Sequence, residues 1–202
     1  MKKTLIAVFI VLLIDQLVKF LVKTTMQLGE EIPLIGDWAV IHFTENPGMA
    51  FGVEIDGNGE KGWGKLALSF FRIIVIIAGF VWMYRMSKKP STSPLLLTTI
   101  GLILGGAIGN LVDCIAYGLI FDHSEGQIAT FMPTHGGYGE FLRGKVVDMF
   151  YFPITTIHFP EWLPFLGGTD YLFFDGIFNV ADAAITVGMA ILLVFQKRFF
   201  PE

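Results

Sequence analysis

The chain has 202 residues, of which 53% are hydrophobic and 16% charged, with a formal net charge of −4 and a mean hydropathy of +0.64. An ordinary soluble domain carries about 25% charged residues, so this composition excludes that class and indicates a membrane protein. The sequence has no basic patch of the kind that binds nucleic acid, so we expect no nucleic-acid partner. Its single cysteine, Cys114, excludes an intrachain disulfide.

Four apolar blocks follow one another along the chain. They cover approximately residues 5–22, 66–84, 94–111 and 178–195. Each is close to the roughly 20 residues with which a helix spans the hydrocarbon core of a bilayer. We therefore expect a membrane all-α protein with a small β element: a single integral membrane domain over residues 1–202, built on four transmembrane helices.

The first block begins after Lys2 and Lys3, as a secretory signal peptide does. No small-residue cleavage pattern follows it, and the block continues through Asp15 to Lys19 and Lys23. These features differ from those of a cleaved signal peptide. We interpret the block as an uncleaved first helix.

Basic residues indicate how the helices are oriented. They gather before the first block, in the link 85–89 between the second and third blocks, and at 197–198 after the fourth. In short loops, lysine and arginine mark the cytoplasmic side of a membrane. A four-helix topology places all three groups on one side, so we expect both termini in the cytoplasm. The two long loops, about 23–65 and 113–177, are then expected outside.

Both long loops carry local signals. Residues 40–43 have the composition of a strand, and the turn signal Glu45-Asn46-Pro47-Gly48 follows them. We therefore expect a short β element at the outer membrane surface. In the second loop, residues 152–168 are rich in aromatic residues and proline, which suits a segment at the membrane interface.

The third block ends in glycines and polar residues. Gly105, Gly106 and Gly109 recur at helical spacing, which allows another helix to approach closely. Asn110 and Asp113 then follow three residues apart, on one face of the same helix. Polar side chains are therefore expected where the helices pack most tightly.

Asp148 and Asp182 are the carboxylates that fit their surroundings least. They lie in GKVVDMFYF and FNVAD, apolar sequence on the expected outer side. A carboxylate near hydrocarbon is costly unless it is paired, solvated or protonated, so both are functional candidates. If the fold brings them together, one pKa rises and the pair shares a proton. Such a pair suits acid–base hydrolysis of a peptide bond by an activated water.

Other acidic residues have simpler interpretations. Asp15 lies four residues before Lys19, so it fits a helix-end charge paired along the helix. Glu54 follows the predicted turn and is expected to be solvated. Neither residue therefore has to belong to a catalytic site.

Other catalytic chemistries have weaker signals. The four histidines show no HExxH or other close ligand spacing, so we expect no metal site. Lys65 and Ser69 are one helical turn apart, as in a serine–lysine dyad. A lysine that snorkels at the start of a membrane helix is the simpler interpretation. Cys114 has no histidine nearby in sequence and is expected to be a buried, inert thiol.

A second class of function also fits the aspartates. A small proton- or ion-coupled transporter, or a membrane assembly factor, uses intramembrane carboxylates to carry protons or bind ions. Composition and spacing alone leave this alternative open.

Five motifs, taken in order, resemble those of the lipoprotein signal peptidases, the type II signal peptidases of bacteria. They are DQLVK, NPGMAFG, GGAIGNLVD, VVDMF and FNVAD, which begin at residues 15, 46, 105, 146 and 178. In chain order they run from the first expected helix, through the β element, to the start of the fourth expected helix.

The resemblance implies an aspartic endopeptidase of the bacterial inner membrane with its active site toward the periplasmic side. Such an enzyme removes the signal peptide of a prolipoprotein by cutting before the cysteine that carries a diacylglyceryl group. It implies Asp148 and Asp182 as the catalytic pair. The residues implied to support the pocket or bind substrate are Asn179, Asn46, Gly48, Asn110, Asp113, Asp15 and Lys19. No cofactor or metal is implied, membrane lipid is the expected surrounding, and we expect a monomer.

The sequence departs from the family pattern in two ways. An arginine usually follows GNxxD, whereas Cys114 stands there in this chain; Arg143 and Lys145, shortly before VVD, are candidate replacements. The segments 119–143 and 152–176 look longer than the usual outer loops. They are candidates for a lid or a partner-binding surface.

Overall fold

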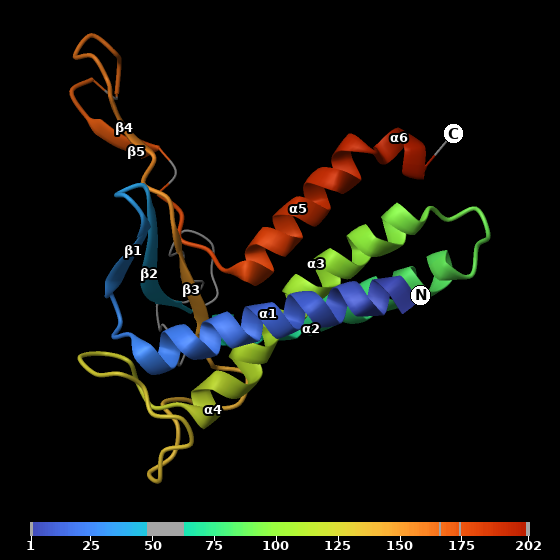
Figure 1. Ribbon diagram of the computed structural model, residues 1–202, viewed down its shortest axis with the longest axis horizontal. Coiled ribbons are helices and arrows are strands. Elements are labelled where there is room, and N and C mark those ends of the chain that lie inside the picture. Colours follow the sequence, from blue (N-terminus) through green and yellow to red (C-terminus); the bar gives the residue numbers. More distant parts are fainter. Residues whose placement is uncertain (1, 48–62, 166, 174, 201–202) are drawn as a thin grey trace.

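Helices dominate the computed structural model, which describes residues 2–47, 63–165, 167–173 and 175–200 (Figure 1). The long helices are α1 (Lys2–Thr25), α2 (Trp63–Ser87), α3 (Pro94–Val112) and α5 (Val180–Val194). The short ones are η3 (Asp113–Tyr117), α4 (Gly118–Ile120) and α6 (Gln196–Phe199). Helix α3 is central, because it packs against α1, α2 and α5.

Three helical segments of the described chain are long and apolar enough to cross a membrane. They are Lys2–Thr25, Trp63–Ser87 and the continuous segment Pro94–Ile120. The fourth apolar helix, Val180–Val194, has 15 residues and is shorter than the predicted span 178–195. The chain turns at Phe195, whose φ of −100° and ψ of 15° end α5 before α6 begins. The crossing by a fourth helix therefore stays a prediction.

The third helical segment continues beyond its predicted end at residue 111. Helix α3 begins with Ser93 as N-cap, which accepts a hydrogen bond from Leu95 N, and with Pro94 in the first turn. At Asp113 the chain passes into η3, a π-helical turn, without leaving helical geometry. Single π turns of this kind occur often at functional sites. Residues 113–120, expected in the outer loop, are thus helical.

The glycines of α3 allow the close packing that the sequence indicated. A Cβ on Gly106 would lie 2.3 Å from the carbonyl oxygen of Ala181 in α5. A Cβ on Gly109 would lie 2.5 Å from Asp15 Oδ2 in α1. Contacts below 3.0 Å are sterically excluded, so only glycine permits α1 and α5 to approach α3 as they do. The predicted small-residue interface is confirmed.

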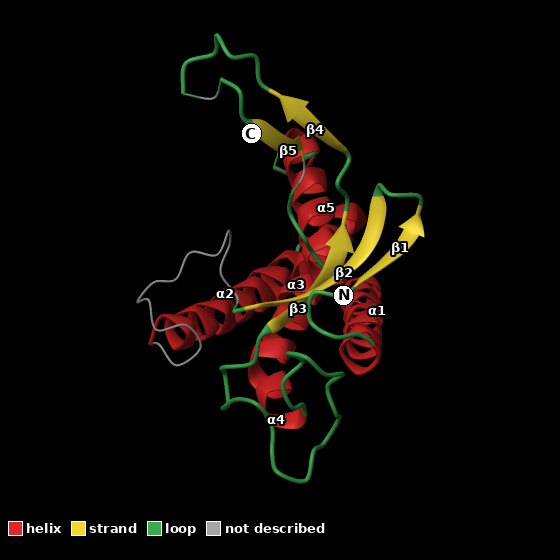
Figure 2. Ribbon diagram, turned by 90° about the vertical axis from the view of Figure 1, so that its left-hand side faces the viewer, coloured by secondary structure: helices red, strands yellow, loops and turns green. Residues whose placement is uncertain are grey.

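Two antiparallel sheets lie at one end of the helices (Figure 2). The three-stranded sheet has the order β1 (Glu31–Ile35), β2 (Ala39–Asn46), β3 (Val146–Tyr151). The strands β4 (Thr155–His158) and β5 (Asp170–Phe173) form a hairpin that projects away from this sheet. The strand expected at 40–43 is confirmed as part of β2. Its partners β1 and β3 come from segments that the sequence did not mark as strands.

One face of the three-stranded sheet packs on a buried core. The core joins the end of α1, strands β2 and β3, and the segment after α3. Its buried members are Val22, Met26, Phe43, Tyr117, Phe121, Ala129, Val147 and Met149. Because side chains alternate across a strand, the neighbouring residues Thr44, Asn46 and Asp148 occupy the opposite face. The core thus fixes which residues are presented on that face.

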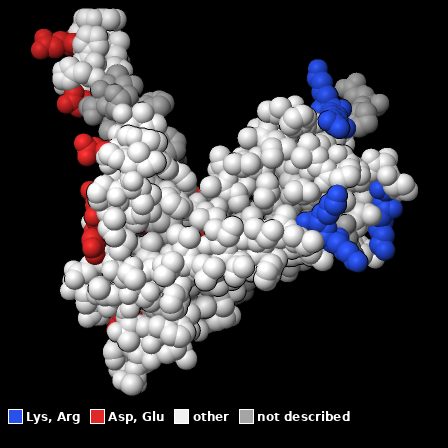
Figure 3. Space-filling view, in the orientation of Figure 1, with Lys and Arg blue, Asp and Glu red and all other residues white. Residues whose placement is uncertain are grey.

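Charge is divided between the two ends of the molecule (Figure 3). Lysine and arginine gather at the helix ends that include the start of α1 and helix α6, whereas aspartate and glutamate lie along the sheet end. Large apolar side chains cover much of the exposed helix surface between them, such as Phe9, which is 63% exposed, and Ile74, also 63% exposed. A mainly apolar middle between two charged ends is typical of the surface of a membrane protein.

Candidate active site

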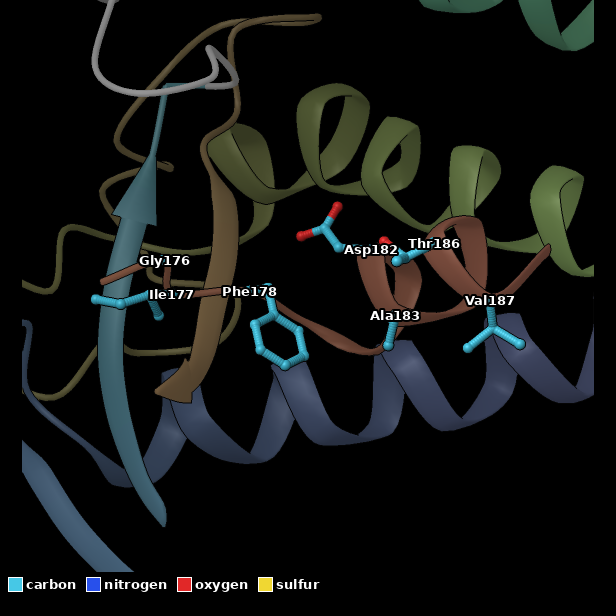
Figure 4. Close-up of a pocket in the computed structure, with 7 residues that line it drawn as sticks. All are labelled: Gly176, Ile177, Phe178, Asp182, Ala183, Thr186 and Val187. Atoms are coloured by element: carbon cyan, nitrogen blue, oxygen red, sulfur yellow. The ribbon is translucent and has the colours of Figure 1, made fainter. Parts of the chain in front are cut away.

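Asp148 and Asp182 are brought together at the junction of sheet and helices. Asp148 lies in the middle of β3, directly opposite Thr44 of β2, and is 3% exposed. Asp182 lies in the first turn of α5 and is half-buried. Figure 4 shows its carboxylate pointing from that turn toward β3. The two carboxylates that were singled out from the sequence thus face the same region.

Asn179 contacts both carboxylates. Its Nδ2 donates to Asp148 Oδ1 at 2.6 Å, and its backbone N–H donates to Asp182 Oδ2 at 3.3 Å. The backbone N–H of Asp182 donates in turn to Asn179 Oδ1 at 2.9 Å. This exchange is a capping box that begins α5. The same residue therefore starts the helix and joins the pair.

Asn110 completes the connection from α3. Its Nδ2 donates to Asp182 Oδ1 at 2.8 Å, and its Oδ1 accepts a hydrogen bond from Asn179 Nδ2 at 3.1 Å. Each oxygen of Asp182 therefore accepts a hydrogen bond. The side chains form a chain of contacts that runs from Asp148 through Asn179 and Asn110 to Asp182.

Asn46 holds Asp148 from the side of β2. Its Nδ2 lies 3.3 Å from Asp148 Oδ2. Asn46 pairs with Val146 across the strands, so it reaches Asp148 as a diagonal neighbour on the same face. With Asn179 on the other oxygen, both Asp148 oxygens accept from amide donors.

Burial raises the pKa of Asp148 to about 7, and the negative charge of Asp182 adds to the rise. The hydrogen bonds from Asn46 and Asn179, and the positive charge of Lys19, oppose it. The rise nevertheless prevails, because desolvation is the largest effect. Asp148 therefore binds a proton at neutral pH far more readily than an ordinary aspartate.

A fully buried lysine lies beneath the pair. Lys19 Nζ contacts Asp15 Oδ2 at 3.0 Å, Asp113 Oδ2 at 2.8 Å and Asn110 Oδ1 at 2.9 Å. These three acceptors match the three N–H donors of an ammonium group. The predicted Asp15–Lys19 pair is confirmed. The pair is not at the surface, because both side chains are 0% exposed.

The two acidic partners of Lys19 hold the chain segments that carry the pair. Asp15 Oδ1 accepts from the backbone N–H of Ala181 at 2.9 Å, in the first turn of α5. Asp113 Oδ2 accepts from the backbone N–H of Val147 at 3.2 Å, one residue before Asp148. Each carboxylate thus fixes the backbone next to one member of the pair.

Gln16 is a site residue that the sequence analysis missed. Its Nε2 contacts Asp15 Oδ2 at 3.1 Å, Asp113 Oδ1 at 2.9 Å and the carbonyl oxygen of Gly109 at 3.2 Å. Its presence in DQLVK, between two residues that were singled out, was the available signal.

An open cavity of about 430 Å³ adjoins Asp182. Its lining residues are Gly176, Ile177, Phe178, Asp182, Ala183, Thr186 and Val187 (Figure 4). Asp182 is the charged residue among these seven, and most of the others are apolar. The cavity can therefore admit a largely apolar chain next to a carboxylate.

The roles of Arg143 and Lys145 as replacements for the family arginine stay predictions. Arg143 lies 3.4 Å from Glu140, and Lys145 lies 3.5 Å from Glu45. It is Arg72 of α2 whose Nη1 donates to the Cys114 thiol at 3.0 Å. Cys114 is buried, as expected. A guanidinium thus lies beside the position after GNxxD, supplied by another helix.

The remaining candidates fall outside this site. Ser69 Oγ donates to the carbonyl oxygen of Leu142 at 3.0 Å. Lys65 is 2% exposed, so its predicted snorkelling is wrong. Gly48 and Glu54 lie outside the described residues. Over the described ranges, the structure groups no three residues of the types His, Cys, Asp and Glu that could hold a metal ion.

The chain has long apolar helices and, where they meet a small sheet, two carboxylates that contact the same asparagine. These features are typical of a membrane protein with an acid–base site. The particular family follows from comparison with known proteins. The chain belongs to the signal peptidase II family, whose model, described as "Signal peptidase (SPase) II", matches residues 7–198. The resemblance drawn from the five motifs is confirmed.

Similar proteins with assigned names also support membership of this family. The lipoprotein signal peptidase of Porphyromonas gingivalis is 44% identical over 191 residues, which cover 95% of this chain and 81% of that protein. That of Amoebophilus asiaticus is 35% identical and covers 92% and 73%. That of Brevibacillus brevis is 34% identical and covers 92% and 88%. The alternative of a transporter or assembly factor has no support from these comparisons.

A solved structure agrees in fold. A bacterial membrane enzyme determined by the in meso method at 2.3 Å resolution has a TM-score of 0.62 and covers 100% of this chain and 93% of its own. At 20% identity this likeness shows the fold alone.

Proposed function

We propose that the protein is an aspartic endopeptidase that removes signal peptides from prolipoproteins, cutting before the cysteine that carries the diacylglyceryl group. Membership of the signal peptidase II family and the names of the relatives support the activity. The observation that carries the assignment of the site is the contact of one asparagine, Asn179, with both Asp148 and Asp182.

The two aspartates have different roles in this mechanism. Asp148, whose pKa is about 7, is the protonated member and donates a hydrogen bond to the scissile carbonyl oxygen. Asp182 lies at the edge of the cavity, and it is the base that takes a proton from the attacking water. The hydroxide adds to the carbonyl carbon, the C–N bond breaks, and the departing amine is protonated by the pair.

The supporting residues act on this pair through defined atoms. Asn46, Asn110 and Asn179 donate hydrogen bonds to carboxylate oxygens and so fix the orientation of the pair. Asp15 and Asp113, which both pair with Lys19, hold the backbone of α5 and β3. Preorganisation of this kind removes the reorientation that would otherwise be required in the transition state.

The membrane arrangement belongs to the same proposal. Helices α1, α2, α3 and α5 cross the bacterial inner membrane as a monomer, with the basic end in the cytoplasm and the sheet toward the periplasm. The division of charge in Figure 3 supports this orientation. The acyl chains of the substrate remain in the lipid, while its peptide reaches the carboxylates beside the sheet.

Cleavage of paired peptides tests the function. The purified protein, in detergent or nanodiscs, is given a prolipoprotein signal peptide whose cysteine carries a diacylglyceryl group, and the same peptide with a free cysteine. We expect mass spectrometry to show one cut, directly before the lipidated cysteine, and little cleavage of the free form. Equal cleavage of both peptides, or a cut elsewhere, would contradict the proposal.

A further inference from the structure

A second buried charge cluster lies on the core side of the three-stranded sheet, opposite the carboxylate pair. Lys23, in the last turn of α1, pairs with Glu45 of β2, and the two side chains are 0% and 3% exposed. Lys23 Nζ also donates to Ser124 Oγ at 2.9 Å, and Ser124 Oγ donates to Glu45 Oε1 at 2.9 Å. The three side chains form a closed triangle, named here the clasp.

Aromatic rings surround the ammonium group of the clasp. Lys23 Nζ lies 5.0 Å from the ring centroid of Tyr138, 5.4 Å from that of Phe121 and 6.0 Å from that of Phe43. A cation within about 6 Å of a ring centroid is attracted to the ring face. The rings also exclude water, so the ion pair with Glu45 acts at low dielectric and is strong.

Glu45 joins four segments of the chain. Besides Lys23 and Ser124, its carboxylate lies 3.5 Å from Nζ of Lys145, the residue that directly precedes β3. The backbone N–H of Lys145 donates to the hydroxyl of Tyr138 at 2.7 Å. The end of α1, strand β2, the segment 121–143 and the start of β3 therefore meet at one side chain.

The clasp lies directly behind the contact between Asn46 and Asp148. Glu45 and Asn46 are neighbours in β2, so their side chains leave opposite faces of the sheet. Thr44 is opposite Asp148, Glu45 is opposite Val147 and Asn46 is opposite Val146, so Glu45 lies between the pairing that includes Asp148 and the pairing that includes Asn46. At 3.3 Å, the Asn46–Asp148 hydrogen bond is near the long limit for such bonds, so a shift of a few tenths of an ångström breaks it.

We propose that Lys23, Glu45 and Ser124 are positioning residues for peptide cleavage: the clasp fixes the end of β2 so that Asn46 meets the Asp148 carboxyl group. This inference rests on the proposed function, and it adds a role for residues that do not contact the carboxylate pair. A buried ion pair is a poor source of net stability, because desolvation offsets much of its attraction. The ion pair instead acts through its geometry: Lys23 and Glu45 meet in only one position of β2 relative to the core.

The test uses near-isosteric variants in the full-length protein. Lys23→Met and Glu45→Gln each remove one charge, and the double variant removes both. Glu45→Gln leaves the buried Lys23 without its carboxylate partner and is expected to lower kcat about tenfold, with KM nearly unchanged. Lys23→Met leaves Glu45 with Lys145 at 3.5 Å and is expected to lower kcat less. The double variant is expected to recover to within about threefold of wild type. Glu140→Gln is the matched control: Glu140 is 83% exposed in its pair with Arg143, and its loss is expected to leave kcat unchanged.

The same variants made in an Asn46→Ala protein distinguish a positioning role of the clasp from a simple loss of folded protein. In an Asn46→Ala protein the contact served by the clasp is already gone, so adding Glu45→Gln is expected to lower kcat no further. All rates are taken per folded protein, measured by size-exclusion chromatography. The inference is overturned if Glu45→Gln lowers kcat equally in both backgrounds, or if the folded single variants match wild type.

Variants that fail to fold do not block the test. Ser124→Ala removes only the neutral member of the clasp, and it replaces the charge variants in the same two backgrounds. Wild-type protein that does not cleave the lipidated peptide contradicts the proposed function instead, so the two failures are distinguishable.

Discussion

At the scale of single residues, Asn179 is the side chain on which the proposed chemistry depends. It caps α5 and donates to Asp148, so the start of the helix and the orientation of the pair are one feature. Asp148 differs from Asp182 mainly in burial, and burial raises its pKa to about 7. In the proposed mechanism, the acid is therefore the more deeply buried of the two residues.

The pKa of Asp148 predicts the pH dependence of cleavage. Activity requires its protonated form, so kcat/KM is expected to fall as pH rises through about 7. The Asn46 hydrogen bond lowers this pKa, because it stabilises the charged form. In Asn46→Ala the pKa of Asp148 is therefore expected to rise, and the fall in activity moves to higher pH.

A cleavage profile between about pH 5 and 9 checks this prediction. The charges that face Asp148 in the profile are Asp182 from α5 and Lys19 from α1, and both stay in the variant. A fall that stays at the same pH, or moves lower, would show that Asn46 does not act on the proton of Asp148.

At the scale of elements, the site depends on how closely three helices meet. Gly106 and Gly109 let α5 and α1 approach α3, and this approach brings Asn110 within 2.8 Å of Asp182. The π turn at Asp113 continues the helix past the site. Packing of the helices and geometry of the carboxylates are thus linked.

Gly106→Ala tests this link. The new Cβ would lie 2.3 Å from a backbone oxygen of Ala181, which cannot rotate away, so α5 must shift together with Asp182. We expect a loss of about 1–3 kcal/mol in the free energy of unfolding and a clear fall in kcat. Thermal unfolding in detergent and the cleavage assay measure the two effects.

Gly79→Ala is the matched control. Its Cβ would lie 2.7 Å from Leu104 Cδ2, the end of a flexible side chain that can move, and it lies on α2, away from Asp182. We expect a smaller effect on stability and none on kcat. Equal losses of kcat in the two variants would refute the link between α5 packing and the site.

The sequence carried enough information to identify the carboxylate pair, but not its surroundings. Asp148 and Asp182 stood out because each lies in apolar sequence and in a family motif. The contact of Gln16 with Asp113 and that of Lys23 with Ser124 were not visible, because they join residues 97 and 101 positions apart. The same distance along the chain hid the pairing of β2 with β3.

The deviations from the predicted elements also have local causes. The third helix runs on to Ile120 because η3 continues its hydrogen bonding where a loop was expected. Helix α5 starts two residues later than the apolar block, because Asn179 caps it. Apolar composition marks the blocks, but caps and turns decide where helices begin and end.

At the scale of the whole molecule, the charge division and the two sheets predict the orientation in the membrane. The basic end holds the start of α1, the turn between α2 and α3, and α6, whereas the sheets lie at the other end (Figures 1 and 3). A site at the sheet end is therefore expected to face the periplasm.

Cysteine labelling tests this orientation. Ser91→Cys lies in the exposed turn between α2 and α3, and Glu161→Cys lies in the exposed loop between β4 and β5. In spheroplasts, a membrane-impermeant maleimide is expected to label Glu161→Cys at once and Ser91→Cys only after lysis. Cys114 is 1% exposed and gives little background. The reverse pattern would invert the topology.

The central claim is that Asp148 and Asp182 together hydrolyse the peptide bond before a lipidated cysteine. The most direct test is the cleavage rate of the diacylglyceryl peptide by wild type, Asp148→Asn and Asp182→Asn, each shown to be folded. Each substitution is expected to lower kcat by about 10²–10⁴-fold. Turnover at the wild-type rate by either folded variant would contradict it.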